Sequence, residues 1–260
     1  MTERYAVIGQ PVAHSKSPWI HAQFARATRQ DIDYGRIEAP LGGFERAAEQ
    51  FRAAGGKGLN VTLPFKEDAF RYCQALSPRA RQACAVNTIT FGTEVFGDNT
   101  DGVGLVRDLG AELPGKRVLL MGAGGAAQGV VGALLEAGVA ALTIANRTET
   151  KAQELAARFS GVTANGYAAL EPGFDLVINA TSAGLDDEAP ALPSGVLARA
   201  KLAYDMVYGR DTPFLAAARA AGARACDGLG MLVEQAAESF FIWRGVRPET
   251  GAVLRKLRGL

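Results

Sequence analysis

Short apolar runs alternate with stretches of helical periodicity along the first hundred residues. Runs rich in β-branched residues predict strands at 5–9, 32–39 and 58–62 and a pair of strands within 86–97. The stretches that follow Ser17 and Gly43 have helical spacing. Because strands and helices alternate, we expect a mainly parallel sheet. The paired run is interrupted near Gly92 and is expected to form a hairpin at the end of that sheet.

The alternation restarts after Lys116. Further strands are predicted at 117–122, 142–146, 175–180 and 201–208, with a helix of small residues after the first and another helix from about Thr148. The apolar stretch 228–245 predicts one long helix, and a last helix is expected to open at Pro248. The expected fold class is therefore α/β, with a second α/β unit after the first.

Charge and composition narrow the possible partners. The 28 Lys and Arg residues nearly balance the 27 Asp and Glu residues, which excludes the basic surface of a nucleic-acid or membrane binder and favours a small, neutral partner. No signal-peptide pattern opens the chain, and no apolar run approaches the roughly 20 residues that span a bilayer, so a cytoplasmic location is expected. The 3 cysteines are widely spaced and there are only 2 histidines, so neither a disulfide framework nor a bound metal is expected.

A glycine-rich turn follows the strand that begins at Arg117 and precedes a helix. It consists of Gly122, Ala123, Gly124, Gly125, Ala126 and Ala127. In a dinucleotide-binding turn the first glycine permits the tight bend, the second lets the backbone approach a pyrophosphate, and a small third residue packs the helix on the strand. The N-terminus of that helix would offer free N–H groups to the phosphates. The sequence therefore predicts a Rossmann-type cofactor domain.

The end of the next strand indicates which dinucleotide binds. An acidic residue there would bind the ribose 2′-hydroxyl of NAD, whereas a basic residue suits the 2′-phosphate of NADP. The chain places Asn146 and Arg147 at this point, followed by Thr148, which could cap the next helix, and by Lys151 one turn on. NADP is therefore the predicted cofactor, although Glu149 lies close by.

Polar residues gather at the predicted ends of strands in the first half. Ser15 and Ser17 follow the first strand, where Ser17 serves either as a helix cap or, with Ser15, as part of a carboxylate cradle. Thr62 and Lys66 follow the third strand, and Lys66 is either a solvated surface residue or part of a site. Asn87 begins a later strand.

The segment 97–102 adds two carboxylates, at Asp98 and Asp101, for which a turn or cap role is as reasonable as a chemical one. Interconversion of a secondary alcohol and a ketone needs a group that moves the hydroxyl proton while hydride moves to or from the cofactor. Either Lys66 donates the proton, or Asp101 is the base while Lys66 neutralises it.

Together these segments resemble the shikimate dehydrogenase family, in chain order and over nearly the whole length. The matching stretches are PVAHSKSP, NVTLPFK, AVNT, GDNTDG, GAGGAA, NRT, NATSAG, YDMVYG and GMLVEQ. The resemblance implies a substrate-binding catalytic domain of residues 1–101 plus 230–260 and an NADP-binding Rossmann domain of residues 102–229. It also implies reversible NADPH-dependent reduction of 3-dehydroshikimate to shikimate in aromatic amino acid synthesis.

The resemblance assigns roles residue by residue. Lys66 and Asp101 would be the catalytic pair. The substrate would be bound by Ser15, Ser17, Thr62, Asn87, Tyr208 and Gln235. The residues lining the nicotinamide would include Thr181 within the segment 179–184, together with Met206, Gly230 and Met231. From its position on a helix alone, Gln235 would be interpreted as a surface residue.

Many relatives carry a second arginine where this chain has Lys151, a change that keeps the charge but loses the forked geometry. Two alternatives remain. One is a relative with broader substrate or cofactor use, such as quinate with NAD, which an acidic residue before Arg147 would favour. The other is a noncatalytic NADPH-sensing protein, whose signature would be loss of Lys66 or Asp101. The expected assembly is a monomer or a homodimer.

Overall fold

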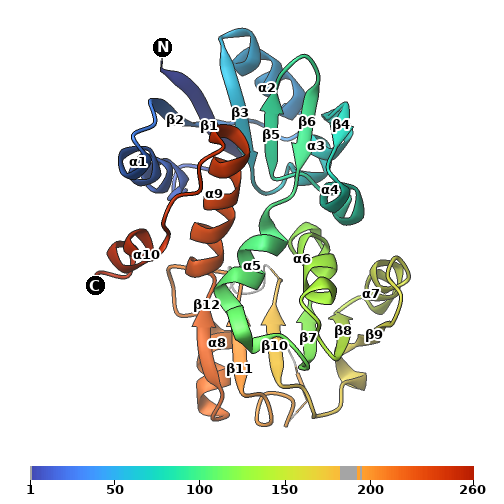
Figure 1. The fold of residues 1–260 in the computed structure, drawn as a ribbon. Coiled ribbons are helices and arrows are strands. Elements are labelled where there is room, and N and C mark those ends of the chain that lie inside the picture. Colours follow the sequence, from blue (N-terminus) through green and yellow to red (C-terminus); the bar gives the residue numbers. More distant parts are fainter. Residues whose placement is uncertain (1, 182–191, 194) are drawn as a thin grey trace. The chain divides into compact units, whose positions relative to one another are not determined.

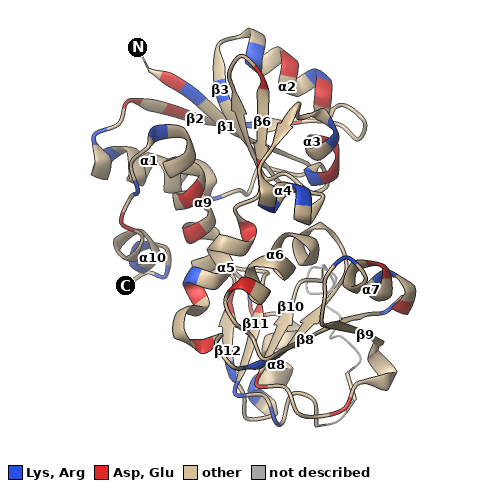
Figure 2. Ribbon diagram, turned by 45° about the vertical axis from the view of Figure 1, so that its right-hand side comes forward, with Lys and Arg blue, Asp and Glu red and all other residues tan. Residues whose placement is uncertain are grey.

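The computed structural model describes residues 2–181, 192–193 and 195–260. The chain divides into two compact units, Met1–Gly104 with Leu232–Leu260 and Leu105–Met231 (Figure 1). In the described part of the chain, no helix is long and apolar enough to cross a membrane. Basic and acidic residues are interspersed along the ribbons (Figure 2), and their numbers nearly balance, with a formal net charge of +1.

The first unit contains a six-stranded sheet in the order β2-β1-β3-β5-β6-β4. Its strands are β1 (Glu3–Gly9), β2 (Ile32–Glu38), β3 (Gly56–Val61), β4 (Ala75–Leu76), β5 (Thr88–Phe91) and β6 (Val95–Asp98). Its helices are α1 (Ser17–Thr28), α2 (Phe44–Ala53), α3 (Lys66–Tyr72), α4 (Pro78–Ala83), most of α9 (Leu229–Arg244) and α10 (Gly251–Leu257). Strand β1 pairs in parallel with β2 and β3, whereas β5 pairs antiparallel with β3 and β6.

The predicted hairpin is confirmed as β5 and β6, which pair from Thr88 and Asp98 to Phe91 and Val95. Its predicted place at the end of the sheet is wrong, because β4 pairs with the outer side of β6. Two residues of strand are too short to leave a periodic signal.

The second unit is built on a six-stranded, fully parallel sheet in the order β12-β11-β10-β7-β8-β9. Its strands are β7 (Arg117–Met121), β8 (Ala141–Asn146), β9 (Val162–Gly166), β10 (Leu176–Asn179), β11 (Leu202–Asp205) and β12 (Arg224–Asp227). Its helices are α6 (Gly125–Glu136), α7 (Glu149–Ala156), α8 (Pro213–Ala220) and most of α5 (Asp101–Leu109), with short 3₁₀ turns at Gly110–Glu112 and Tyr167–Ala169. This strand order is that of the doubly wound dinucleotide-binding fold, in which ligands bind where the order reverses, between β7 and β10.

Alternating strand residues bury the two faces of this second sheet. Leu120 and Ile178 pack with Val130 and Leu134 of α6, in a core that also takes in α5 and α7. The intervening residues, such as Leu119 and Val177, pack with Phe214 and Leu215 of α8 in a separate core. Because both faces are covered, the strands read in sequence as continuous apolar runs. The predicted α/β class is therefore confirmed.

The last helix begins at Gly251 rather than at Pro248, so the predicted start is wrong. The preceding segment is held along α9 instead: the Arg247 guanidinium pairs with Glu238 at 2.6 Å and lies over the Phe241 ring. Side-chain contacts with a neighbouring helix thus override the local preference of proline for a first helical turn.

Candidate active site

Lys66 and Asp101 form a close ion pair within the first unit. Lys66 begins α3 immediately after the turn that follows β3, and Asp101 begins α5 after β6. The Lys66 Nζ atom lies 2.5 Å from Oδ2 of Asp101, and the two side chains are only 13% and 8% exposed. A charge-assisted pair this shielded from water holds an ammonium group, a proton donor, at a fixed place.

Asn87 fixes the second oxygen of the Asp101 carboxylate. Its Nδ2 donates to Oδ1 of Asp101 at 2.8 Å and to Oγ1 of Thr100 at 2.9 Å. Its Oδ1 accepts from the backbone N–H of Thr100 at 2.9 Å. Both carboxylate oxygens are therefore engaged. Thr100 was not singled out from the sequence, although the GDNTDG segment that contains it was.

Gln235 reaches the same cluster from α9. Its Oε1 lies 3.4 Å from both Nδ2 of Asn87 and Oγ1 of Thr100, and its Nε2 donates to the Leu232 carbonyl at 2.8 Å. The helix alone would place this glutamine at the surface, but it is partly buried against Asn87. The structure thus brings Lys66, Asn87, Asp101 and Gln235 together from four segments of the chain.

A buried polar network continues from Asn87 toward α1. Asn60 of β3 donates to the Asn87 carbonyl at 3.2 Å and to Ser239 Oγ at 2.9 Å, and its Oδ1 accepts from the Tyr34 hydroxyl at 2.7 Å. Burial raises the pKa of Tyr34 well above its ordinary value, so the phenol remains a donor. Sequence reasoning missed Tyr34 and Ser239, because nothing local distinguishes them from ordinary strand and helix residues.

Ser15 lies in the turn after β1 and Ser17 opens α1, so the predicted capping role of Ser17 is wrong. Ser17 is already the first residue of α1, and the N-cap position belongs to Lys16, whose side chain makes no capping bond. Instead, Ser15 Oγ accepts from the Ser17 N–H at 3.3 Å. Thr62 follows β3, the neighbour of β1, and is half-buried. These segments leave neighbouring strands at the same edge of the sheet.

His21 is completely buried on α1 and is not placed to bind a metal. Its ring stacks on Tyr34 with centroids 4.1 Å apart and contacts Phe24, Phe240 and Trp243. Burial lowers the pKa of His21 to about 3, so the imidazole is neutral. Among the described residues no group of three His, Cys, Asp or Glu side chains could hold a metal ion.

In the glycine-rich turn of the second unit, only some of the glycines are needed for the backbone conformation or for packing within the protein. Gly122 has a φ of +107°, and a Cβ atom there would lie 3.1 Å from the Ala180 carbonyl oxygen. Gly124 occupies the N-cap position of α6 with ordinary extended dihedrals, and a Cβ atom on Gly124 or Gly125 would meet nothing within 4 Å. Open space beside glycines that need no special conformation fits a bound ligand.

Ala127 and the first turn of α6 share two further features of dinucleotide-binding turns. Ala127 is fully buried in the core between α6 and the sheet, where only a small residue allows close packing. The first turn of α6 carries no acidic residue, so the positive end of the helix dipole is not neutralised. The residues present therefore fit a dinucleotide pyrophosphate.

Two exposed cations follow β8, where a 2′-phosphate would lie. Among the described residues neither Arg147 nor Lys151 pairs with a carboxylate, and both are exposed. Asn146 Nδ2 donates to the Thr148 carbonyl at 2.9 Å, which shapes the turn. The nearby Glu149 carboxylate accepts from Gln153 Nε2 at 3.0 Å. Thr148 stands at the N-cap of α7 but makes no capping bond, so that expectation is wrong.

A buried carboxylate organises the ends of β10 and β11. Asp205 Oδ1 accepts from Asn179 Nδ2 at 3.2 Å and from the Val207 N–H at 3.0 Å, while its Oδ2 accepts from Thr212 at 2.6 Å. Burial raises the pKa of Asp205 above its ordinary value. The Thr181 hydroxyl in turn donates to Asn179 Oδ1 at 2.7 Å. These bonds fix the turns that carry Thr181 and the segment 206–208. Residues 182–184 of the predicted nicotinamide-lining segment lie outside the described residues.

Gly230 and Met231 lie in the first turn of α9. A side chain on Gly230 would collide with Asp108, whose Oδ2 accepts from the Tyr204 hydroxyl at 2.7 Å. Met231 is buried in the core of the second unit. The requirement for glycine at 230 therefore has a structural cause within this unit, whatever its part in cofactor binding.

Comparison with known proteins decides the family. Residues 7–89 match the family described as "Shikimate dehydrogenase substrate binding domain", residues 105–186 match "Shikimate / quinate 5-dehydrogenase", and residues 228–258 match "Shikimate 5'-dehydrogenase C-terminal domain". This chain belongs to the shikimate dehydrogenase family. The resemblance inferred from the sequence motifs is thereby confirmed.

Individual shikimate dehydrogenase relatives match over almost the full length. A protein of Chromobacterium violaceum named shikimate dehydrogenase (NADP(+)) is 59% identical, covering 99% of this chain and 98% of its own. The crystal structure of an Ael1 enzyme from Pseudomonas putida has a TM-score of 0.93 at 48% identity, with 98% of each chain covered. A shikimate 5-dehydrogenase of Thermus thermophilus, solved with NADP(H) and shikimate, has a TM-score of 0.89 at 36% identity, with 99% of each chain covered.

Proposed function

We propose that this protein catalyses the reversible, NADPH-dependent reduction of 3-dehydroshikimate to shikimate in chorismate and aromatic amino acid biosynthesis. The observation that carries the proposal is the shielded Lys66–Asp101 pair at 2.5 Å, with Asn87 and Gln235 gathered around it. The relative named shikimate dehydrogenase (NADP(+)) at 59% identity supports the same reaction and cofactor.

The substrate-binding residues proposed are of two kinds. Hydroxyl groups would hold the substrate carboxylate, from Ser15, Ser17, Thr62 and Tyr208. Amide and charged groups would meet the ring hydroxyls, from Asn87, Gln235, Lys66 and Asp101. Neutral hydroxyls beside the N-terminus of α1 suit a carboxylate, because the helix start adds N–H groups and a partial positive charge.

Lys66 is proposed as the group that passes the proton to the substrate oxygen. When bound, NADPH supplies the hydride. The Asp101 carboxylate holds the ammonium group in place through Oδ2, and Asn87 prevents that carboxylate from rotating by holding Oδ1. In the alcohol-to-ketone direction the pair accepts the hydroxyl proton. In the alternative scheme Asp101 is the base and Lys66 neutralises its charge.

NADP would bind in the second unit. Residues 122–127 and the start of α6 would hold the pyrophosphate, and the nicotinamide would lie near Thr181, Met206, Gly230 and Met231. The 2′-phosphate would be bound by Asn146, Arg147, Thr148 and Lys151. Support for this last group comes from the two exposed cations, which have no carboxylate partner among the described residues.

The proposal also covers the location, assembly and domain boundaries of the protein. We infer a cytoplasmic enzyme that acts as a monomer or a homodimer on small molecules, without nucleic-acid or membrane partners. The near balance of 28 basic and 27 acidic residues supports the absence of nucleic-acid and anionic membrane partners. Residues 1–101 with 230–260 would form the substrate domain and residues 102–229 the NADP domain.

Four assays test the proposal together. Absorbance of the reduced nicotinamide is followed with shikimate or quinate, each with NADP or NAD. We expect the highest kcat/KM with shikimate and NADP. A preference for quinate or for NAD would favour the broader relative, and no turnover in any combination, despite NADPH binding, would favour a noncatalytic sensor.

A further inference from the structure

Arg79 lies at the centre of an ion cluster beside the candidate site, and no step of the proposed reaction uses it. Its Nε and Nη2 atoms donate to the two oxygens of Asp98 at 2.7 and 2.8 Å, a bidentate fork. Its Nη1 atom donates to Glu238 Oε1 at 3.1 Å. The Asp98 and Glu238 side chains are only 8% and 10% exposed, and that of Arg79 is 34% exposed.

The first arm of this cluster leads to Asp101. Asp98 Oδ1 also accepts from the Ser77 hydroxyl at 2.5 Å and from the Asn99 N–H at 2.7 Å, so the loop after β6 is fixed at its first residue. Asn99 Oδ1 then accepts from the Asp101 N–H at 3.1 Å. The backbone that presents the Asp101 carboxylate to Lys66 is thus built on the residue that Arg79 holds.

The second arm leads to Gln235. Glu238 and Gln235 both belong to α9 and lie three positions apart, which places them on neighbouring turns of one helical face. A contact that ties Glu238 to Asp98 therefore also sets the height and rotation of α9 at Gln235 relative to the loop that carries Asp101. The loop after β6 and helix α9 are far apart in the sequence. The guanidinium group of Arg79 binds both, through Asp98 and Glu238.

We propose that Arg79 is a positioning residue, which sets the spacing between Asp101 and Gln235 and so the shape of the pocket for the substrate ring hydroxyls. This inference rests on the proposed function for its kinetic consequence. The guanidinium geometry matters as well as the charge, because only a planar fork can bind both Asp98 oxygens and still reach Glu238.

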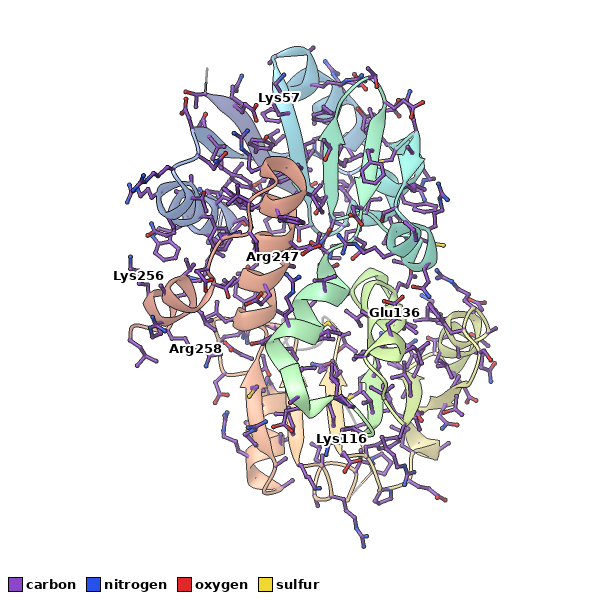
Figure 3. All side chains as sticks on the ribbon, viewed as in Figure 1. Lys57, Lys116, Glu136, Arg247, Lys256 and Arg258 are labelled. Carbon is purple, nitrogen blue, oxygen red and sulfur yellow. The ribbon has the colours of Figure 1, made fainter. Side chains whose placement is uncertain are left out.

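Arg247 provides a matched control. It binds the other oxygen of Glu238, Oε2, at 2.6 Å, but forms no part of the fork to Asp98. Figure 3 labels Arg247 beside α9. Removing it takes away the same guanidinium group from the same carboxylate while leaving the link between the loop and the helix in place.

The test compares Arg79→Gln, Arg79→Lys and Arg247→Gln with the wild-type protein. For Arg79→Gln we expect kcat/KM with shikimate to fall about 10- to 100-fold, the usual cost of misplacing a site by about 1 Å, with KM for NADP little changed. Arg79→Lys should lie between the wild type and Arg79→Gln, because it keeps the charge without the fork. Arg247→Gln should keep kcat/KM close to wild type. Thermal unfolding of each variant establishes that it is folded.

Amide hydrogen exchange adds a readout that does not depend on turnover. In Arg79→Gln the amides of Asn99, Thr100 and Asp101 should exchange faster than in Arg247→Gln, because only the former loses the clamp on Asp98. The inference is overturned if these amides stay equally protected in both variants, or if a folded Arg79→Gln has wild-type kcat/KM. It is also overturned if Arg247→Gln loses as much kcat/KM. A wild-type protein that does not oxidise shikimate would contradict the proposed function alone, and hydrogen exchange would still decide the role of Arg79.

Discussion

Asn87 holds the Asp101 carboxylate by the oxygen that Lys66 does not contact, through a 2.8 Å bond from its Nδ2 atom to Oδ1. The amide is itself fixed, because its own Oδ1 accepts from the Thr100 N–H at 2.9 Å. Asp101 therefore cannot rotate away from Lys66 without breaking a buried hydrogen bond, which costs about 1–3 kcal/mol when it leaves a polar group unpaired. The position of the Lys66 ammonium is thus determined by residues that lie far from it in the sequence.

Replacing Lys66 tests its proposed role in proton transfer. We expect Lys66→Ala to lower kcat by roughly 10² to 10⁴ fold, the usual range for a general acid or base, with a smaller effect on substrate binding. Steady-state kinetics with shikimate and NADP measure both. Lys57→Ala, which removes an exposed lysine of β3 in the same unit, is the control and should leave kcat unchanged. Near-normal turnover in Lys66→Ala would refute the assigned role.

Most of the fold could be predicted because the second sheet has both faces buried. Runs such as residues 118–121 are apolar throughout, and this pattern together with the turn at Gly122 is recognisable without any other part of the chain. Strand β4 escaped prediction because it has two residues. The edge strands β9 and β12 were not predicted either, because none of their residues is fully buried and their sequences form no apolar run. The start of α10 was misplaced because Arg247 binds a glutamate on another helix, a tertiary contact that local preference does not reveal.

The candidate site was predictable only in part, because several of its residues are positioned by tertiary contacts and not by local sequence. Lys66 and Asp101 stand at ends of predicted strands, where ligands bind in α/β sheets, so they could be proposed from the sequence. Gln235 required the family resemblance. Asn60 and Ser239 contact each other across 179 residues of sequence, and Arg79 and Glu238 across 159. Such pairs are fixed by packing of the whole unit, which no local pattern encodes.

Arg147 is expected to distinguish NADP from NAD. Arg147→Ala should raise KM for NADP while KM for NAD changes little, because the guanidinium would contact only the 2′-phosphate. Kinetics with both cofactors at saturating shikimate provide the measurement. Lys116→Gln is the control. It removes one positive charge from the same unit, directly before β7, and so shows how much of the effect comes from the loss of net charge alone. Equal losses with both cofactors in Arg147→Ala would show that Arg147 does not bind the 2′-phosphate.

His21 predicts a dependence of stability on pH. Burial lowers its pKa to about 3 in the folded protein, whereas the unfolded chain has an ordinary value near 6.5. As pH falls below about 6.5, His21 therefore becomes protonated in the unfolded state but stays neutral in the folded state. Stability is lost between there and pH 3, and the loss from this group amounts to about 2 kcal/mol between pH 7 and pH 5.

Urea unfolding at pH 7 and pH 5 measures this loss. His21→Phe keeps an aromatic ring against Tyr34 and cannot be protonated, so its free energy of unfolding should fall by about 2 kcal/mol less than that of the wild type over the same pH range. His14→Gln removes the other of the 2 histidines, which is exposed, and should behave as the wild type does. An identical pH dependence in wild type and His21→Phe would contradict the buried, neutral state of His21.

The two ends of α6 allow cofactor binding to be separated from stability. Gly124, at the N-cap, has a φ of −85° and room for a Cβ atom, so Gly124→Ala should change the free energy of unfolding by less than about 1 kcal/mol, because the lower entropy of the unfolded chain offsets the loss of a preferred N-cap residue. Its new methyl group would lie where the pyrophosphate is expected, so the Kd for NADPH should rise about tenfold or more, equivalent to at least about 1.4 kcal/mol. Gly138, just beyond the C-terminal end of the helix, has a φ of +78°, and Gly138→Ala should cost about 1–2 kcal/mol of stability with no change in Kd. Fluorescence titration with NADPH and thermal unfolding of both variants give the four values. Unchanged NADPH affinity in Gly124→Ala would mean that the open space beside this glycine is not where the cofactor phosphates bind.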